Sequence, residues 1–326
     1  MILVTGATGF LGRNLCQHLA AQGCSLRALV RPTSDTAFLR KLGVELAPGD
    51  VTDAASVRAA AQGCRHVVHT AAYFRLWGPP EPFIRTNIQG TQNVLRAAQA
   101  AGVEKFVHIS TIIVVGPQPG HAPITEATPR TPYRSDNYAK TKTIGEKLAL
   151  EFSGRGLPVV VLRLGALYGP YGHYAFNRLF FEEFLHNWRV QVHRGRHLIF
   201  PCYVGDAASG IELALRHGRA GEIYNISGES ISHREANRII SQLSGRSSWR
   251  INVPAGLMLQ FVKLLELLAH FTNREPFYPE NLKPYVFNDW PVDSGKARRD
   301  LGFEPLTFAE GAQRTLNWYK AIGYRV

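Results

Sequence analysis

The sequence lacks the patterns that mark several specialised protein classes. None of its four cysteines (Cys16, Cys24, Cys64 and Cys202) forms a Cys-x-x-Cys pair, and no His/Cys cluster has zinc-finger spacing. It contains no internal repeat and no low-complexity tract. Met1 runs directly into the apolar Ile2-Leu3-Val4, without the basic segment of a cleaved export signal. We therefore expect reduced thiols, no bound metal and a cytoplasmic protein.

The charge balance is basic but not clustered. The 326 residues carry 37 Lys and Arg against 25 Asp and Glu, a formal charge of +12. No block of five or more like charges occurs, and no nucleic-acid-binding signature is present. We expect no nucleic-acid partner; a phosphate-bearing cofactor accounts for the basic balance better.

The first 115 residues alternate short β-branched runs with longer helical patterns, which predicts parallel strands joined by crossover helices. The predicted fold class is α/β, a doubly wound parallel Rossmann sheet with a smaller, mostly helical C-terminal substrate region. The nucleotide domain is expected over residues 1–170, with a return segment near 196–227. The substrate region is expected over 171–195 and 228–326. The predicted strands cover 2–4, 26–30, 44–47, 66–69, 106–109, 159–164, 198–199 and 223–226. The predicted helices cover 11–22, 81–101, 137–152, 176–188, 206–216, 232–243 and 308–319.

Residues 256–271 form the longest apolar stretch. It is shorter than the roughly 20 residues of a membrane span, and its polar residues Lys263, Glu266 and His270 follow at near-helical spacing. We expect an amphipathic helix that covers the substrate site and has one wet face. Association with a membrane surface or a partner helix is the less favoured alternative.

A glycine-rich turn follows the first predicted strand and opens a helix, the context that a dinucleotide-binding turn requires. Gly6 suits the tight turn, Gly9 lets a pyrophosphate approach the backbone, and Gly12 allows close packing of helix and strand. Predicted cofactor contacts within this turn are Gly6, Thr8, Gly9, Phe10, Leu11 and Gly12.

The end of the second strand indicates which dinucleotide binds. Arg31 stands 19 residues after Gly12, where NAD-specific folds usually carry an acidic residue for the ribose 2′-hydroxyl. A cation there suits a 2′-phosphate, and Arg13 is placed to assist, so NADP(H) is favoured over NAD(H). Asp50-Val51 is expected to bound the adenine pocket. The small residues of Thr70-Ala71-Ala72 would let the cofactor lie across the strand ends.

Tyr138 and Lys142 are four residues apart at the start of a predicted helix and so share one face. A neighbouring ammonium favours the phenolate, so Lys142 is expected to lower the pKa of Tyr138 and to orient the nicotinamide ribose. Ser110 and Thr111 end the fifth strand, where parallel sheets gather ligands. Either hydroxyl suits a substrate carbonyl.

These motifs together resemble the extended short-chain dehydrogenase/reductases of the NAD-dependent epimerase/dehydratase superfamily. Leu29-Val30-Arg31-Pro32-Thr33-Ser34 and Ala72-Tyr73-Phe74-Arg75-Leu76-Trp77 are similar to the dihydroflavonol-4-reductase-like and 3β-hydroxysteroid dehydrogenase-like subgroup. The resemblance implies Thr111 as the catalytic hydroxyl, a structural role for Asn87, and a homodimer through helices 81–101 and 137–152. It also marks Gly165 as a departure, because relatives often have proline there.

Three functions are weighed. The first is NADP(H)-dependent reduction of a ketone, or oxidation of its secondary alcohol, on an apolar or aromatic small molecule. The second is a nucleotide-sugar epimerase or dehydratase with tightly bound NAD. The third is a non-catalytic dinucleotide-binding protein. An aromatic-rich pocket favours the first, with Tyr138 as general acid/base. The expected pocket residues are Tyr73, Phe74, Trp77, Phe176, Phe180, Phe181 and Trp188.

Overall fold

The computed structural model describes residues 1–118, 120, 122–188, 190–272 and 274–326. Its centre is a seven-stranded sheet in the order β11-β6-β5-β4-β1-β2-β3, and every pairing within it is parallel. The strands are β1 (Ile2–Thr5), β2 (Leu26–Val30), β3 (Glu45–Pro48), β4 (His66–His69), β5 (Lys105–Thr111), β6 (Val159–Leu164) and β11 (Ile223–Ile226). From β1 the chain builds outward to β2 and β3, then returns to β4 on the other side. The carboxyl ends of β1 and β4 therefore flank the switch point where such sheets bind ligands.

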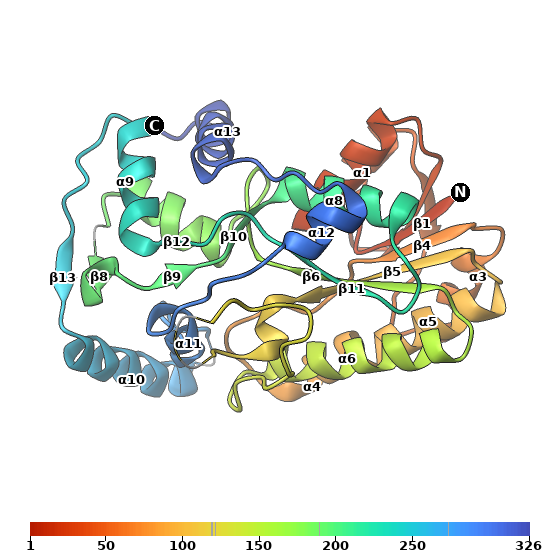
Figure 1. Ribbon diagram of the computed structural model, residues 1–326, viewed down its shortest axis with the longest axis horizontal. Helices are drawn as coiled ribbons and strands as arrows, with labels where there is room; N and C mark the ends of the chain where they lie inside the picture. Colours follow the sequence, from red (N-terminus) through yellow and green to blue (C-terminus); the bar gives the residue numbers. More distant parts are fainter. Residues whose placement is uncertain (119, 121, 189, 273) are drawn as a thin grey trace.

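Helices cover both faces of the sheet, as Figure 1 shows. One layer holds α1 (Phe10–Ala21), α8 (Val204–His217) and α12 (Gly295–Leu301). The other holds α3 (Ala54–Ala61), α5 (Thr91–Ala100) and α6 (Asn137–Gly154). Neighbouring strand residues serve opposite layers: Val4 packs into the first core and Leu3 into the second. The doubly wound Rossmann architecture predicted from the sequence is confirmed.

A third apolar core lies beyond the sheet, at the left of Figure 1. It joins η3 (Asn177–Glu182), α7 (Glu183–Leu185), α9 (His233–Leu243) and α13 (Phe308–Ala321). Three two-stranded ladders brace this region: β7 (Ala166–Tyr168) with β10 (Pro201–Tyr203), β9 (Leu198–Ile199) with β12 (Ile231–Ser232), and β8 (Val190–Val192) with β13 (Ile251–Val253). Beside it lie α10 (Ala255–Thr272) and α11 (Lys283–Val286).

The helix predicted over 81–101 is not a single α-helix. It consists of α4 (Pro80–Phe83), the π-helical segment η1 (Ile84–Gly90) and α5. At Gly90 a Cβ would come within 2.8 Å of Val51 Cγ2, so this wider turn packs closely on the loop after β3. π-Helical turns of this kind occur frequently at functional sites.

A buried ion pair joins α6 to β6. The Glu146 side chain is 0% exposed and that of Arg163 is 1% exposed, and Arg163 Nη2 donates to Glu146 Oε1 over 2.8 Å. Arg130 Nε donates to the same oxygen at 2.6 Å, and Ser110 Oγ donates to Oε2 at 2.5 Å. Burial alone would raise the pKa of Glu146, but these donors outweigh it and hold the pKa below its usual value.

Replacing Glu146 by alanine should be strongly destabilising, because Arg163 would remain buried without its carboxylate. We expect Glu146→Ala to lower the free energy of unfolding by about 3–5 kcal/mol, measured by chemical denaturation. Glu151→Ala is the control from the same helix, since that side chain is 56% exposed. Its loss should stay within about 0.5 kcal/mol. Equal stability of the two variants would contradict this role for the pair.

Candidate active site

The turn between β1 and α1 has the shape that a pyrophosphate needs. Gly6 has a φ of +72°, and a Cβ there would lie 2.7 Å from the backbone nitrogen of Ala71. A Cβ on Gly12 would lie 2.1 Å from the Gly6 carbonyl oxygen. Helix α1 begins with neither a side-chain cap nor an acidic residue in its first turn. Its N–H groups are therefore available to an anion, and the turn fits a dinucleotide.

The predicted residues at the end of β4 adjoin this turn. Thr70 Oγ1 donates to the Thr5 carbonyl oxygen at 2.7 Å, and Ala71 faces Gly6. Ala72 is exposed. Buried His69 bonds Thr5 Oγ1 through Nδ1 and Thr91 Oγ1 through Nε2. The structure thus brings the carboxyl ends of β1 and β4 together. Within the turn itself, Thr8, Phe10 and Leu11 are half-buried and Gly9 is exposed.

A cavity of about 240 Å³ lies beside the start of α1 and is lined partly by Thr8, Arg13 and Ser34. The Arg13 guanidinium is 4.7 Å from the centre of the Phe38 ring and 4.9 Å from that of Tyr171. These rings fix the cation by cation–π contact. Arg13, which the sequence assigned a supporting role, is thus the residue held at this cavity.

The other predicted adenosine-side residues are placed differently. Arg31 ends up exposed, and it is not among the residues that line the cavity beside α1. Asp50 Oδ1 accepts hydrogen bonds from the backbone nitrogen and hydroxyl of Thr52, both at 2.8 Å. Val51 is buried, and its carbonyl accepts from Asn93 Nδ2. Asp50 therefore holds its own loop through one carboxylate oxygen.

Tyr138 lies in the first turn of α6, half-buried, with its ring centre 4.5 Å from that of Phe74. Asp136 caps this helix by accepting from the Ala139 backbone nitrogen at 2.9 Å. Its other carboxylate oxygen accepts from the Tyr285 hydroxyl at 3.0 Å. Burial and the nearby Asp136 charge both raise the pKa of Tyr138 well above its ordinary value.

Lys142 is 4% exposed and donates from Nζ to the Ile109 carbonyl oxygen at 2.5 Å. Burial lowers the pKa of Lys142 to about 8, against the opposing charge of Glu146. The prediction that Lys142 lowers the pKa of Tyr138 is wrong, because burial and Asp136 determine the shift. Lys142 instead ties α6 to the end of β5, one residue before Ser110.

The two hydroxyls at the end of β5 differ in their engagement. Ser110 is 2% exposed, and its Oγ donates to Glu146 Oε2. Thr111 is 9% exposed, and its hydroxyl forms no hydrogen bond within the part of the chain that the structure describes. Thr111 is therefore the hydroxyl left available at this strand end.

Two further residues from the sequence have clear structural roles. Asn87 accepts from the Tyr73 backbone nitrogen at 2.8 Å and donates to the Thr141 hydroxyl at 3.0 Å, so it ties the loop after β4 to α6. A Cβ on Gly165 would lie 2.6 Å from the Phe200 carbonyl oxygen. Lack of space accounts for glycine at this position.

The predicted aromatic pocket is partly wrong. Phe176 and Phe181 are buried in the third core, packed on Tyr168, because the π-helical segment η3 turns both rings inward. Phe74 does contact Tyr138, and Trp77 lies edge-on to His270 of α10. Tyr73 packs edge-on against Phe83; Phe180 and Trp188 line a separate cavity.

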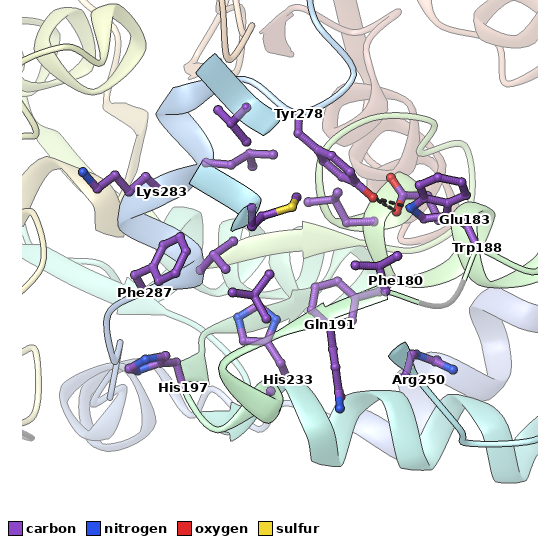
Figure 2. Close-up of a pocket in the computed structure, with 18 of the residues that line it drawn as sticks. Phe180, Glu183, Trp188, Gln191, His197, His233, Arg250, Tyr278, Lys283 and Phe287 are labelled. Carbon is purple, nitrogen blue, oxygen red and sulfur yellow. Dashed lines mark hydrogen bonds between the residues drawn. The ribbon is translucent and has the colours of Figure 1, made fainter. Parts of the chain in front are cut away.

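That cavity lies beneath α10 and is shown in Figure 2. Most of its wall is apolar and includes Leu179, Phe180, Phe184, Val190, Met258, Leu259 and Val262. Glu183 is its buried carboxyl group: Oε2 accepts from the Tyr278 hydroxyl at 2.9 Å, while Oε1 has no hydrogen-bond partner among the described residues. Helix α11 separates the cavity from Tyr138, with Lys283 and Val286 on the cavity side and Tyr285 bonded to Asp136.

Sequence reasoning missed Asp136, Tyr285, Glu146 and Glu183. Asp136 carries a readable signal, since an aspartate directly before a helical pattern is a typical N-cap. Tyr285 carries none, because 149 residues separate it from Asp136. The two glutamates resemble ordinary surface charges until the fold buries them.

The glycine turn, the doubly wound sheet and the Tyr138/Lys142 pair define a Rossmann-fold protein of the short-chain dehydrogenase/reductase type. The model of the NAD dependent epimerase/dehydratase family matches residues 2–227, and the chain belongs to this family. It is an oxidoreductase of that family or a related epimerase or dehydratase, and the extended-subgroup resemblance seen in the sequence is confirmed.

Named relatives cover nearly the whole chain. A putative dihydroflavonol 4-reductase of Synechocystis is 28% identical over 98% of this chain and 95% of its own. A 3 beta-hydroxysteroid dehydrogenase/Delta 5-->4-isomerase of Mycobacterium tuberculosis is 31% identical over 98% and 90%. A dTDP-glucose 4,6-dehydratase double mutant from Streptomyces venezuelae, solved with NAD, superposes with a TM-score of 0.80 at 28% identity, covering 98% and 97%.

The buried carboxyl of Glu183 should make stability pH-dependent. Burial raises the pKa of Glu183 to about 7 from its ordinary value of 4.5, and the side chain is 10% exposed. Between pH 4.5 and 7 the folded protein keeps the Glu183 proton, whereas the unfolded chain has already lost it. The free energy of unfolding that this group contributes is therefore fully present below pH 4.5 and is lost as the pH rises through 7.

We expect Glu183→Gln to unfold at nearly the wild-type free energy at pH 4.5. At pH 8 the variant should be the more stable protein by roughly 2–3 kcal/mol. Denaturant titrations across this range measure the difference, with exposed Glu151→Gln as the control. A difference that stays flat between pH 4.5 and 8 would show that this carboxyl is not perturbed.

Proposed function

We propose that the protein is an NADP(H)-dependent oxidoreductase that reduces a ketone of an apolar or aromatic small molecule, or oxidises the matching secondary alcohol. The observation that carries this proposal is the half-buried Tyr138 phenol near Asp136, at the carboxyl edge of a sheet with a dinucleotide turn. When bound, the dinucleotide supplies or accepts the hydride.

The surroundings of Tyr138 favour proton donation. A phenol whose pKa is raised by burial and by Asp136 stays protonated at neutral pH. It can therefore give its proton to the oxygen of a carbonyl that is being reduced. Removing that proton, as alcohol oxidation requires, needs a further positive charge near the phenol. The residues in place favour the reducing direction.

Thr111 and Lys142 complete the proposed chemistry. The Thr111 hydroxyl, free of other side-chain bonds in the described chain, can donate to the substrate oxygen and steady its developing negative charge. Lys142 fixes the distance between α6 and β5 through its bond to Ile109. With its pKa near 8, it remains mostly an ammonium at pH 7 and can donate to ribose hydroxyls.

Residues beside α1 support NADP(H) over NAD(H). Arg13 is held over two rings at a cavity that also presents the Ser34 side chain, a donor set suited to a phosphate. Exposed Arg31 adds a positive charge after β2. Asp35 also lines the cavity, and its Oδ1 accepts from the Ala37 backbone nitrogen.

An apolar substrate is supported by Phe74 against Tyr138 and by the apolar cavity on the other side of α11. The relative named for 3 beta-hydroxysteroid dehydrogenase activity is consistent with this class. The structural neighbour solved with NAD supports the second candidate, a nucleotide-sugar epimerase or dehydratase. Stoichiometric NAD extracted from the purified protein would favour that candidate.

The test is substrate-dependent consumption of NADPH with a panel of cyclic and aryl ketones. We expect turnover with NADPH to exceed that with NADH. Tyr138→Phe should lower kcat by about 10²–10⁴-fold, and Thr111→Val by about 10²-fold, without weakening NADPH binding. Ser110→Ala is the matched control and should keep kcat within a few-fold, because its hydroxyl serves Glu146 Oε2, an oxygen that still accepts from Arg163 Nε in the variant. Absence of turnover with every ketone, or full activity of Tyr138→Phe, would contradict the proposal.

A further inference from the structure

The outward face of α10 is apolar. Leu257, Phe261, Leu264, Leu268 and Phe271 follow a spacing of four and three residues, which places them on one side of a helix. They are 42–82% exposed. Of the polar residues expected on one wet face, Gln260, Lys263 and His270 are exposed and Glu266 is half-buried, but most of the exposed side chains of α10 are leucine and phenylalanine.

The opposite side of α10 is packed on the protein. Val262 and Ala269 are buried, and Met258, Leu259 and Val262 form part of the wall of the apolar cavity. Glu266 Oε1 accepts from the Glu280 backbone nitrogen. By length and composition alone, the 18-residue helix α10 is long and apolar enough to cross a membrane, with a mean hydropathy of 1.3. A helix fixed along one whole side is instead suited to lie flat in an interface.

The chain before α10 and its β8 neighbour also expose aromatic and apolar side chains. β13 leads into α10. Ile251, the first residue of β13, is 53% exposed, and Trp249, two residues before it, is 65% exposed. β13 pairs with β8, next to which Trp188 is 48% exposed. Figure 1 places β8, β13 and α10 along one edge of the molecule. Tryptophan is enriched where proteins meet the headgroup region of a bilayer.

The charge of the whole chain selects the occupant. On α10 and the segment after it, residues 255–283, charges are balanced: Lys263, Arg274 and Lys283 against Glu266, Glu275 and Glu280. The whole chain carries +12. An apolar helix face on a strongly basic protein complements an anionic lipid bilayer, whereas a second copy of this chain would present the same net positive charge.

We propose that α10 docks the protein onto an anionic membrane surface, with Leu264, Leu268 and Phe271 inserted among the lipids. Docking brings the wall of the cavity beneath α10 next to the bilayer. If the proposed function holds, a lipid-dissolved ketone reaches that cavity without crossing water. Docking itself does not depend on the reaction.

The test is co-sedimentation of the full chain with vesicles of phosphatidylcholine alone or with 30% phosphatidylglycerol. Wild-type protein should pellet with the anionic vesicles, less in 0.5 M salt, and only weakly with phosphatidylcholine. Leu264→Gln/Phe271→Gln should weaken binding at least about tenfold, since two apolar side chains no longer leave water. Ile144→Gln/Ile322→Gln, two similarly exposed apolar positions elsewhere, should bind as wild type does.

The proposal is overturned if wild-type protein stays in the supernatant with anionic vesicles, or if both double variants bind equally well. It is also overturned if the α10 variant only converts an oligomer into monomers in light scattering, with no vesicle binding in either form. Turnover of a water-soluble ketone should be unchanged in the α10 variant. Loss of docking and loss of the proposed reaction are therefore distinguishable.

Discussion

The arrangement of the site depends on the buried ion pair between Glu146 of α6 and Arg163 of β6. The pair fixes how far α6 stands from the sheet and how it is rotated. One turn earlier, Lys142 reaches the Ile109 carbonyl; another turn earlier, Tyr138 meets Phe74. A fully buried ion pair is stable only when its oxygens and N–H groups are hydrogen-bonded. Ser110 and Arg130 supply the further donors to Glu146. Ser110 is thereby occupied and Thr111 remains available.

Burial has opposite effects on the two titratable groups of α6. It disfavours the charged form of each, so the pKa of Tyr138 rises while that of Lys142 falls. Burial and Asp136, not Lys142, determine the direction in which the pKa of Tyr138 is shifted. A neutral phenol beside Asp136 is a proton donor, and the Asp136 carboxylate is itself held by Tyr285 from a distant part of the chain. The C-terminal region thus helps to set the chemistry of a Rossmann-domain residue.

The sheet was predictable from sequence because its strands are short apolar runs between glycine turns, as in residues 2–4 and 159–164. Short helices such as α3 were not predicted, because eight residues give little periodicity. Within the site, Tyr138, Lys142 and the glycine turn were found because their spacing is local. Glu146 and Tyr285 were not, because their importance arises from partners brought close by folding. The apolar run at 256–271 was recognised, but sequence alone did not reveal which of its faces would be covered.

The central claim is that the protein holds Tyr138 as a neutral phenol, ready to donate a proton. Its most direct test is an NMR titration of protein labelled with ¹³Cζ-tyrosine, with the Tyr138 signal assigned from the spectrum of Tyr138→Phe. The account predicts that the Tyr138 resonance keeps the chemical shift of a neutral phenol from pH 6 to pH 10. A resonance that moves to the phenolate position near pH 7 would contradict it, and would return Lys142 to the role of activating this tyrosine.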